Sequence, residues 1–317
     1  MTRGLPRPRR LLRLLPTLLL AFALSGCDTR GPAAPLADLP PPRAAQTPVR
    51  PVLLWRAEAG SSVVHLLGSV HVARPELYPL DPRIETAFAE SDALVLELSL
   101  DSGAQLEAAE RMLEAGRLPA GVRLADVVEP ATWELFQDKQ KERGQGVFGL
   151  RGFHPWFVAL TLTTQALEAA GFSAEHGIDE HFRVAAEGKK RVIALETVQE
   201  QLALFTGLSK ETEETLLRQT LTELDQYGSE LDAAFRAWSN GDSKALDELL
   251  IGPMRQTYPQ LFEQLFTLRN RRMTDKVLGL MAERPGRYFV VVGAGHLIGS
   301  DGIVDLLRSR GIVAAQQ

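Results

Sequence analysis

Cysteine is almost absent from this sequence: Cys27 is the only one in 317 residues. A lone cysteine excludes a disulfide within the chain, and it excludes a metal site built from several thiolates. Common catalytic and nucleotide-binding motifs are missing too. The sequence contains no His-Glu-x-x-His, no Gly-x-Ser-x-Gly elbow, no phosphate-binding loop and no dinucleotide fingerprint. A thermolysin-type zinc site is therefore excluded.

An excess of positive charge is also lacking. The chain has 35 Lys and Arg against 40 Asp and Glu, a formal net charge of −5. Five of the arginines lie in the first 26 residues, so the remainder carries 30 basic against 40 acidic side chains. Nucleic acids and anionic membrane surfaces are bound through basic patches. The composition therefore argues against nucleic acid or an anionic membrane surface as a main partner.

The amino terminus has the features of a secretory signal. Residues 1–26 contain five arginines and no acidic residue, and an apolar stretch runs from Leu14 to Leu24. This stretch is too short to span a bilayer comfortably, and it leads into Leu24-Ser25-Gly26-Cys27, which resembles a bacterial lipobox. We therefore expect a lipoprotein signal peptide over residues 1–26 and lipidation of Cys27. The alternative fate of a lone cysteine is burial as a free thiol.

Residues 27–51 are rich in proline and alanine and predict an extended tether. The rest of the chain, residues 52–317, is long enough for one large globular domain. Together these features predict a protein of the bacterial cell envelope that faces the periplasm and is held at a membrane by acyl chains on Cys27.

Short apolar segments alternate with helix-like segments in residues 52–317. The predicted strands are Val52–Arg56, Val63–Leu67, Ala93–Leu98, Arg191–Leu195 and Tyr288–Val292, the first two forming a hairpin across Gly60. The predicted helices are Gln105–Ala115, Pro130–Lys141, Pro155–Ala170, Asp179–Glu187, Lys210–Gln226, Glu230–Ser239, Tyr258–Ala282 and Gly302–Arg310. This order predicts an α/β fold with a central, mostly parallel sheet flanked by helices. The interval from Leu202 to Glu283 lacks a strand and predicts a helical insertion or lid.

Two of the predicted strands end in the same pattern, Gly-x-x-His. The first contains His71 and the second contains His296. Open α/β sheets place ligand-binding and catalytic groups at the carboxyl ends of their strands. We therefore expect His71 and His296, far apart in sequence, to meet at one edge of the sheet.

Carboxylates lie at the ends of two further predicted strands: Glu97 is close to the carboxyl end of Ala93–Leu98, and Glu196 directly follows Arg191–Leu195. Two imidazoles with one or two carboxylates suit a divalent metal ion that activates water, and a carboxylate outside the metal shell suits a general base. Simpler roles are open for each group. His71 would cap a helix, His296 would bond a loop carbonyl, Glu97 would form a structural ion pair, and Glu196 would cap the helix beside Thr197.

The other candidates have structural explanations. His65 lies within a strand and is expected to pack in the core. His176 and His181 are five residues apart, which does not place both on one helical face. Asp179 is expected to cap the helix over Glu180–Glu187.

An ordered set of short segments over residues 52–313 resembles the TraB/PrgY/GumN family, which includes the Tiki proteases. The matching segments are Leu67-Gly68-Ser69-Val70-His71, Pro79–Pro82, Leu94-Val95-Leu96-Glu97, His154-Pro155-Trp156, Gly177-Ile178-Asp179, Ala194-Leu195-Glu196-Thr197, Tyr258-Pro259, Arg269-Asn270 and Val292-Gly293-Ala294-Gly295-His296-Leu297.

The resemblance implies a Tiki-like α/β fold and a site that contains His71, Glu97 and His296. It also implies a role for Arg269, from the Arg-Asn pair of the family, in clamping substrate or stabilising an oxyanion. Leu268 stands where the family often has an acidic residue, which leaves the direction of Arg269 open. Tiki members imply metal-dependent peptide cleavage, with manganese or cobalt in preference to zinc.

The leading hypothesis is a metal-dependent hydrolase acting on peptide bonds. His71, His296 and Glu97 would bind the metal, Glu196 would act as base or orienter, and Arg269 would clamp substrate or charge. Trp156 and the helical insertion would line the substrate entrance. Two alternatives stay open: a metal-free, esterase-like hydrolase that uses His71 and Glu97, and a non-catalytic protein that binds a peptide or small ligand.

Overall fold

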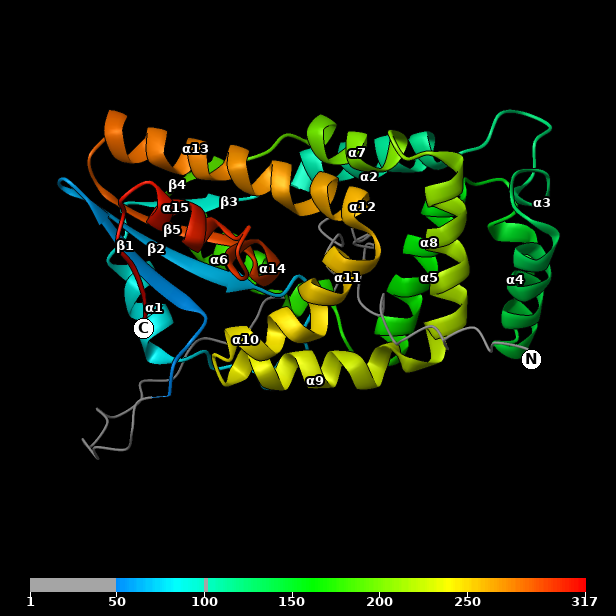
Figure 1. Ribbon diagram of the computed structural model, residues 1–317, viewed down its shortest axis with the longest axis horizontal. Helices are drawn as coiled ribbons and strands as arrows, with labels where there is room; N and C mark the ends of the chain where they lie inside the picture. Colours follow the sequence, from blue (N-terminus) through cyan, green and yellow to red (C-terminus); the bar gives the residue numbers. More distant parts are fainter. Residues whose placement is uncertain (1–49, 100–101) are drawn as a thin grey trace, which may run out of the picture.

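A six-stranded sheet forms the centre of the computed structural model, which describes residues 50–99 and 102–317 (Figure 1). Its order is β4-β3-β5-β2-β1-β6. Strands β4, β3, β5 and β2 are mutually parallel, whereas β1 is antiparallel to β2 and β6 is antiparallel to β1. The strands are β1 (Leu54–Ala59), β2 (Ser62–Ser69), β3 (Ala93–Leu96), β4 (Arg191–Ala194), β5 (Arg287–Gly293) and β6 (Ala314–Gln316). The predicted α/β class with a mostly parallel sheet is confirmed.

The position of each strand explains its composition. β5 lies between β2 and β3, and its run Val290–Val292 is fully buried, as expected for a strand covered on both faces. β4 is an edge strand, and its residues are exposed or half-buried. The hairpin between β1 and β2 forms as predicted, and Gly60 takes the positive φ of +58° that its turn requires. The short strand β6 is not evident in the sequence.

Helices cover both faces of the sheet, with α13 above the strands and α1 below them in Figure 1. On one face lie α1 (Pro82–Ala89) and α6 (Ile178–Ala186), and their Phe88 and Phe182 rings pack against Phe289 of β5. On the other face lie α13 (Leu268–Glu283), α14 (Ala294–Leu297) and α15 (Ile303–Ser309). The side chain of Tyr288, the neighbour of Phe289, points toward α13, and its hydroxyl donates to the carbonyl of Arg284, the C-cap of that helix. Alternation along β5 therefore supplies both layers of the core.

The chain leaves the neighbouring strands β2 and β5 toward opposite faces of the sheet. β2 leads to α1 on one face, and β5 leads to α14 and α15 on the other. Such a divergence opens a crevice at the carboxyl ends of the two strands, which is the usual ligand position in open α/β sheets.

Two helical segments extend beyond these carboxyl ends (Figure 1). The segment between β3 and β4 contains α2 (Ser102–Gly116), α3 (Leu124–Val127), α4 (Pro130–Glu142) and α5 (Pro155–Ala169). The segment between β4 and β5 contains α7 (Val198–Thr206), α8 (Lys210–Glu223), α9 (Tyr227–Ser239), α10 (Ser243–Leu246), α11 (Gly252–Thr257) and α12 (Pro259–Phe262). Helices α5 and α8 pack side by side and join the two segments.

The stretch from Leu202 to Glu283, which the structure describes throughout, contains no strand, so the predicted helical insertion is present. Its last part is helical without a break over residues 259–283, as expected over Tyr258–Ala282, and the π-helical turn η7 (Glu263–Thr267) lies within it between α12 and α13. A second π-helical turn, η6 (Asp247–Ile251), follows α10.

The amino-terminal predictions concern residues that the structure does not describe. The signal peptide over residues 1–26, Cys27 and most of the tether over residues 27–51 lie outside the described residues. Within residues 50–99 and 102–317, no helix has both the length and the apolar character needed to cross a membrane.

Candidate functional site

The four ionisable groups predicted at strand ends meet at one edge of the sheet. His71 follows β2, Glu97 follows β3, Glu196 follows β4, and His296 lies in α14 directly after β5. Glu97, Glu196 and His296 are buried. Because these strands are parallel, their carboxyl ends share one edge, which is why residues more than 200 positions apart become neighbours.

Gly293 lies at the centre of the group. Its backbone N–H donates to Glu97 Oε1 at 2.6 Å. A Cβ at this position would lie 3.3 Å from both Glu97 Oε1 and His71 Nε2, and 3.6 Å from His296 Cδ2. Nε2 of His71, the Glu97 carboxylate and the His296 ring therefore all approach the same point, which is kept free of a side chain.

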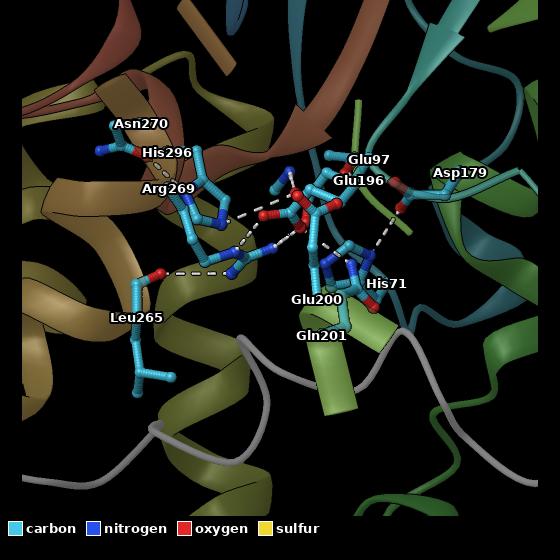
Figure 2. Close-up of polar contacts among 12 residues, drawn as sticks. His71, Glu97, Asp179, Glu196, Glu200, Gln201, Leu265, Arg269, Asn270 and His296 are labelled. Carbon is cyan, nitrogen blue, oxygen red and sulfur yellow. Dashed lines mark hydrogen bonds and ion pairs between the residues drawn. The ribbon is translucent and has the colours of Figure 1, made fainter. Parts of the chain in front are cut away.

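Arg269 is buried and binds both carboxylates (Figure 2). Its Nη2 donates to Glu97 Oε2 at 2.7 Å and to Glu196 Oε2 at 2.6 Å, and its Nε donates to Glu196 Oε1 at 2.8 Å. Its Nη1 donates to the Leu265 carbonyl at 3.2 Å. The residue before it, Leu268, is exposed, so the absence of an acidic residue there does not redirect Arg269. Arg269 is not a surface arginine but the counter-charge of the site.

Asn270 fixes the proton of His296. The Asn270 Nδ2 group donates to the Asp301 carbonyl at 2.7 Å, which turns its Oδ1 toward His296 Nδ1 at 2.6 Å. Nδ1 must therefore carry the hydrogen. The lone pair of His296 is on Nε2, which is buried, has no hydrogen-bond partner, and lies 3.7 Å from Glu97 Oε1.

Asp179 holds His71 in a similar way. His71 Nδ1 lies 2.9 Å from Asp179 Oδ2, and Ser69 Oγ donates to Asp179 Oδ1 at 3.0 Å. The expectation that Asp179 caps the following helix is therefore wrong. Gly177 occupies the N-cap of α6, and the Asp179 side chain turns to the β2 end instead.

Charge in the site is unevenly distributed. Burial alone would lower the pKa of His71, but the Asp179 carboxylate and then Glu97 raise it to about 9. Burial lowers the pKa of His296 to about 4, so this ring is neutral at pH 7. Burial alone would raise the pKa of Glu97, but the two histidines and Arg269 outweigh it and hold this pKa below its ordinary value. The two histidines therefore differ in charge when no metal is bound.

Several simpler roles considered for these residues do not fit. Thr197 is the N-cap of α7 and forms a capping box with Glu200, so Glu196 is not needed as a cap. Gln201 Nε2 donates to Glu196 Oε2 at 3.1 Å, which occupies this carboxylate further. Trp156 is 1% exposed and stacks on Phe205, so the expectation that it lines an entrance is wrong.

The donors suit a divalent metal ion in chemistry but are not yet arranged as a metal centre. In the described part of the chain, no group of three or more His, Cys, Asp or Glu side chains is placed to hold a metal ion. The Nε2 atom of His71 and the ring of His296 nevertheless approach one point, each ring is oriented by a partner on Nδ1, and the buried Nε2 of His296 is unpaired. Such outer hydrogen bonds are typical of metal-binding histidines. In chemistry and in the orientation of their rings, these residues suit a divalent metal ion.

The sequence analysis did not predict the site contacts of three residues, Asp179, Gln201 and Asn270. Asp179 and Asn270 stand in matched family segments, Gly177-Ile178-Asp179 and Arg269-Asn270, which was the available signal. Gln201 carries no such signal, because it reaches Glu196 only through the turn into α7.

Comparison with known proteins gives a family and distant relatives. The family model described as the TraB/PrgY/gumN family matches residues 53–316. The uncharacterized protein YbaP of Escherichia coli is 29% identical over 252 residues, which are 78% of this chain and 89% of YbaP. A protein named metalloprotease TIKI homolog from Amphimedon queenslandica and metalloprotease TIKI1 from Danio rerio are each 24% identical. Those matches cover 81% and 78% of this chain, but only 60% and 59% of the relatives. No solved structure matches the chain.

Proposed function

We propose that this chain, which belongs to the TraB/PrgY/gumN family, is a hydrolase that cleaves peptide bonds with a divalent metal ion. One observation carries the proposal: His71 Nε2, Glu97 Oε1 and the His296 ring converge beside Gly293, and each histidine is oriented through its Nδ1. The distant relatives named metalloproteases support the same class of reaction. The chain spans about 60% of those relatives, so their whole activity is not transferred to it.

His71, His296 and Glu97 would hold the metal. Two imidazoles and one carboxylate leave coordination positions open for water and substrate. We propose manganese or cobalt in preference to zinc, which is what the resemblance to the Tiki proteases implies. When bound, the metal would polarise the scissile carbonyl and lower the pKa of a bound water. The described residues offer no thiolate for this role, in keeping with the single cysteine of the sequence.

Arg269 and Glu196 keep Glu97 in place. Glu196 is engaged by two nitrogens of Arg269 and by Gln201, so it is a poor candidate for the general base and acts as a positioning residue. Arg269 reaches Glu97 through Nη2 and neutralises part of the negative charge. Glu97 is then the carboxylate that faces Gly293, and it is the residue we assign to contact the reacting water.

The experiment combines metal content with activity. The full chain is purified without chelator, and bound metal is measured by elemental analysis beside His71→Ala and His296→Ala. The control is His65→Gln, which changes a half-buried histidine inside β2, away from the site edge. We expect metal and metal-stimulated cleavage of a peptide library in the native chain and in His65→Gln, and loss of both in the two site variants. Unchanged metal content in both site variants would refute the ligand assignment.

A metal-free hydrolase is the second candidate, and the raised pKa of His71 favours it. A protonated His71 close to Glu97 is an acid beside a base, which is a pair able to catalyse hydrolysis. Full peptide cleavage after exhaustive chelation would select this candidate. Retention of an intact ligand, with no product when manganese, cobalt or zinc is supplied, would instead indicate a binding protein.

We also propose that the protein is anchored at the periplasmic side of a membrane by acyl chains on Cys27. The support is the lipobox-like sequence Leu24-Ser25-Gly26-Cys27 after a basic, apolar leader. Expression of the full chain and of Cys27→Ala, followed by membrane fractionation and labelling with a fatty-acid analogue, tests it. Label and membrane retention in both proteins, or in neither, would contradict the proposal.

A further inference from the structure

An apolar pocket with about 50 Å³ of space for water-sized spheres lies beside His71. One wall is the site itself, because the end of β2 from Ser69 to Val72, together with Gly293 and Ala294, lines it. The opposite wall comes from α9 and from the π-helical turn η6, through Leu231, Phe235 and Leu250. This space holds a few water molecules, at about 10–15 Å³ for each, and therefore suits a single side chain rather than a whole small-molecule ligand.

The few polar groups of this lining are used elsewhere. The Trp238 ring forms part of the pocket, and its Nε1–H donates to the Gly68 carbonyl at 2.6 Å. Ser69 Oγ donates to Asp179, and the same carboxylate accepts from His71 Nδ1. What the pocket presents to a ligand is therefore aromatic rings and aliphatic side chains, except at His71.

We propose that this pocket binds one large apolar side chain, of leucine or phenylalanine size, in the substrate residue next to the cleaved bond. His71 and Gly293 line both the pocket and the candidate site, so a side chain in the pocket places its own backbone beside those residues. The cleavage part of this inference rests on the proposed hydrolase function. The preference for an apolar side chain rests on the lining alone.

The lining also excludes other side chains. An ammonium group inside the pocket would lose its water and find no carboxylate among the lining residues. A carboxylate would find only His71, which Asp179 already pairs, so its burial is costly too. A small side chain would leave the space partly empty, and a single missing methylene already lowers kcat/KM by about 10-fold or more in apolar enzyme pockets. We therefore expect leucine or phenylalanine to be preferred over alanine by more than about 10-fold, and aspartate and lysine to be rejected.

Neighbouring leucines of η6 provide a matched pair of variants. Leu250 lines the pocket, whereas Leu249 is 44% exposed and does not. Leu250→Trp fills the pocket, and Leu249→Trp adds the same bulk outside it. Phe235→Ala enlarges the pocket and serves as a further variant if Leu250→Trp fails to fold, which thermal unfolding would reveal.

The first measurement is kcat/KM for peptides that differ at one position beside the cleaved bond, with the full chain and its three variants. We expect Leu250→Trp to lose the preference for leucine and phenylalanine over alanine, and Leu249→Trp to keep this preference. Phe235→Ala should shift the preference from leucine toward phenylalanine. Cleavage without an apolar preference, or a preference that survives Leu250→Trp and Phe235→Ala, would overturn the pocket and leave the hydrolase proposal standing.

The second measurement needs no turnover. Ligand-observed NMR follows binding of N-acetyl-L-leucinamide and N-acetyl-L-aspartamide to the same proteins. We expect the leucine probe to bind the native chain and Leu249→Trp, and to bind Leu250→Trp at least several-fold more weakly. If this binding result is found and no peptide is hydrolysed, the proposed role of the pocket is supported and the proposed hydrolase function is refuted. Equal binding of the two probes, or unchanged binding of the leucine probe by Leu250→Trp, would refute the proposal that this pocket binds an apolar side chain.

Discussion

Replacing Arg269 by methionine removes the counter-charge of two buried carboxylates. Glu97 and Glu196 are 4% and 6% exposed, and Arg269 donates to both. Methionine fills similar space but leaves both carboxylates without a positive partner on that side. Breaking a buried pair by removing one partner costs about 3–5 kcal/mol of folding free energy, chiefly because the remaining charge stays desolvated.

Two further variants show whether charge is the cause. Arg269→Met combined with Glu196→Gln removes one of the stranded carboxylates, so we expect it to recover part of the loss. Arg271→Met changes an exposed arginine two residues along α13 and should cost no more than about 0.5 kcal/mol.

Urea unfolding at pH 7 and pH 5 in the presence of a chelator measures all three variants. Without Arg269, Glu97 would lose one of the charges that hold its pKa down, and burial would raise this pKa. Protonation of Glu97 at lower pH should therefore reduce the destabilisation of the variant. The stability gap between Arg269→Met and the native chain should therefore narrow as the pH falls from 7 to 5. A loss below about 1 kcal/mol, or a gap that does not change with pH, would refute this account of the buried cluster.

The remaining predictions concern the partners of the two histidines. In the chelated protein the pKa of His71 is raised from 6.5 to about 9, so its charged pairing with Asp179 stabilises the fold fully below pH 6.5 and is lost as the pH rises through 9. Asp179→Asn should thus cost up to about 3 kcal/mol at pH 6 and much less at pH 9.5 in urea unfolding; an equal cost at both would contradict it. Asn270→Leu removes the acceptor of His296 Nδ1, so titration calorimetry with manganese should show an affinity about 10–100-fold weaker, and unchanged affinity would count against a metal role for His296.

Strands β1 to β5 and the four strand-end groups were predictable because their signals are local. Each run, such as Tyr288–Val292, is apolar over a strand's length, and the Gly-x-x-His pattern follows within four residues. Parallel pairing then brings His71 and His296 to one edge without further information. The fold class followed from the same alternation of strands and helices.

The contacts of Asp179 and Asn270 could not be predicted in this way. Asp179 starts a helix, where a capping role is the ordinary expectation, and only the packing of α6 against the sheet brings it to His71. Asn270 reaches His296 because α13 crosses the opposite face. β4 is exposed because it lies at the edge of the sheet, and Trp156 is buried because it stacks on Phe205 of α7. Both depend on tertiary packing rather than on a local sequence pattern.

The start of β1 lies at the same sheet edge as the four strand ends. Antiparallel pairing sets Leu54 opposite Leu67 of β2, so the chain comes into the domain close to His71. With Cys27 held at a bilayer as proposed, the 24 residues between it and Val52 would span at most about 80 Å when fully extended. The tether would then limit the distance between the candidate site and the membrane. The site could reach proteins on or near that membrane surface, but not proteins farther from it than the tether allows.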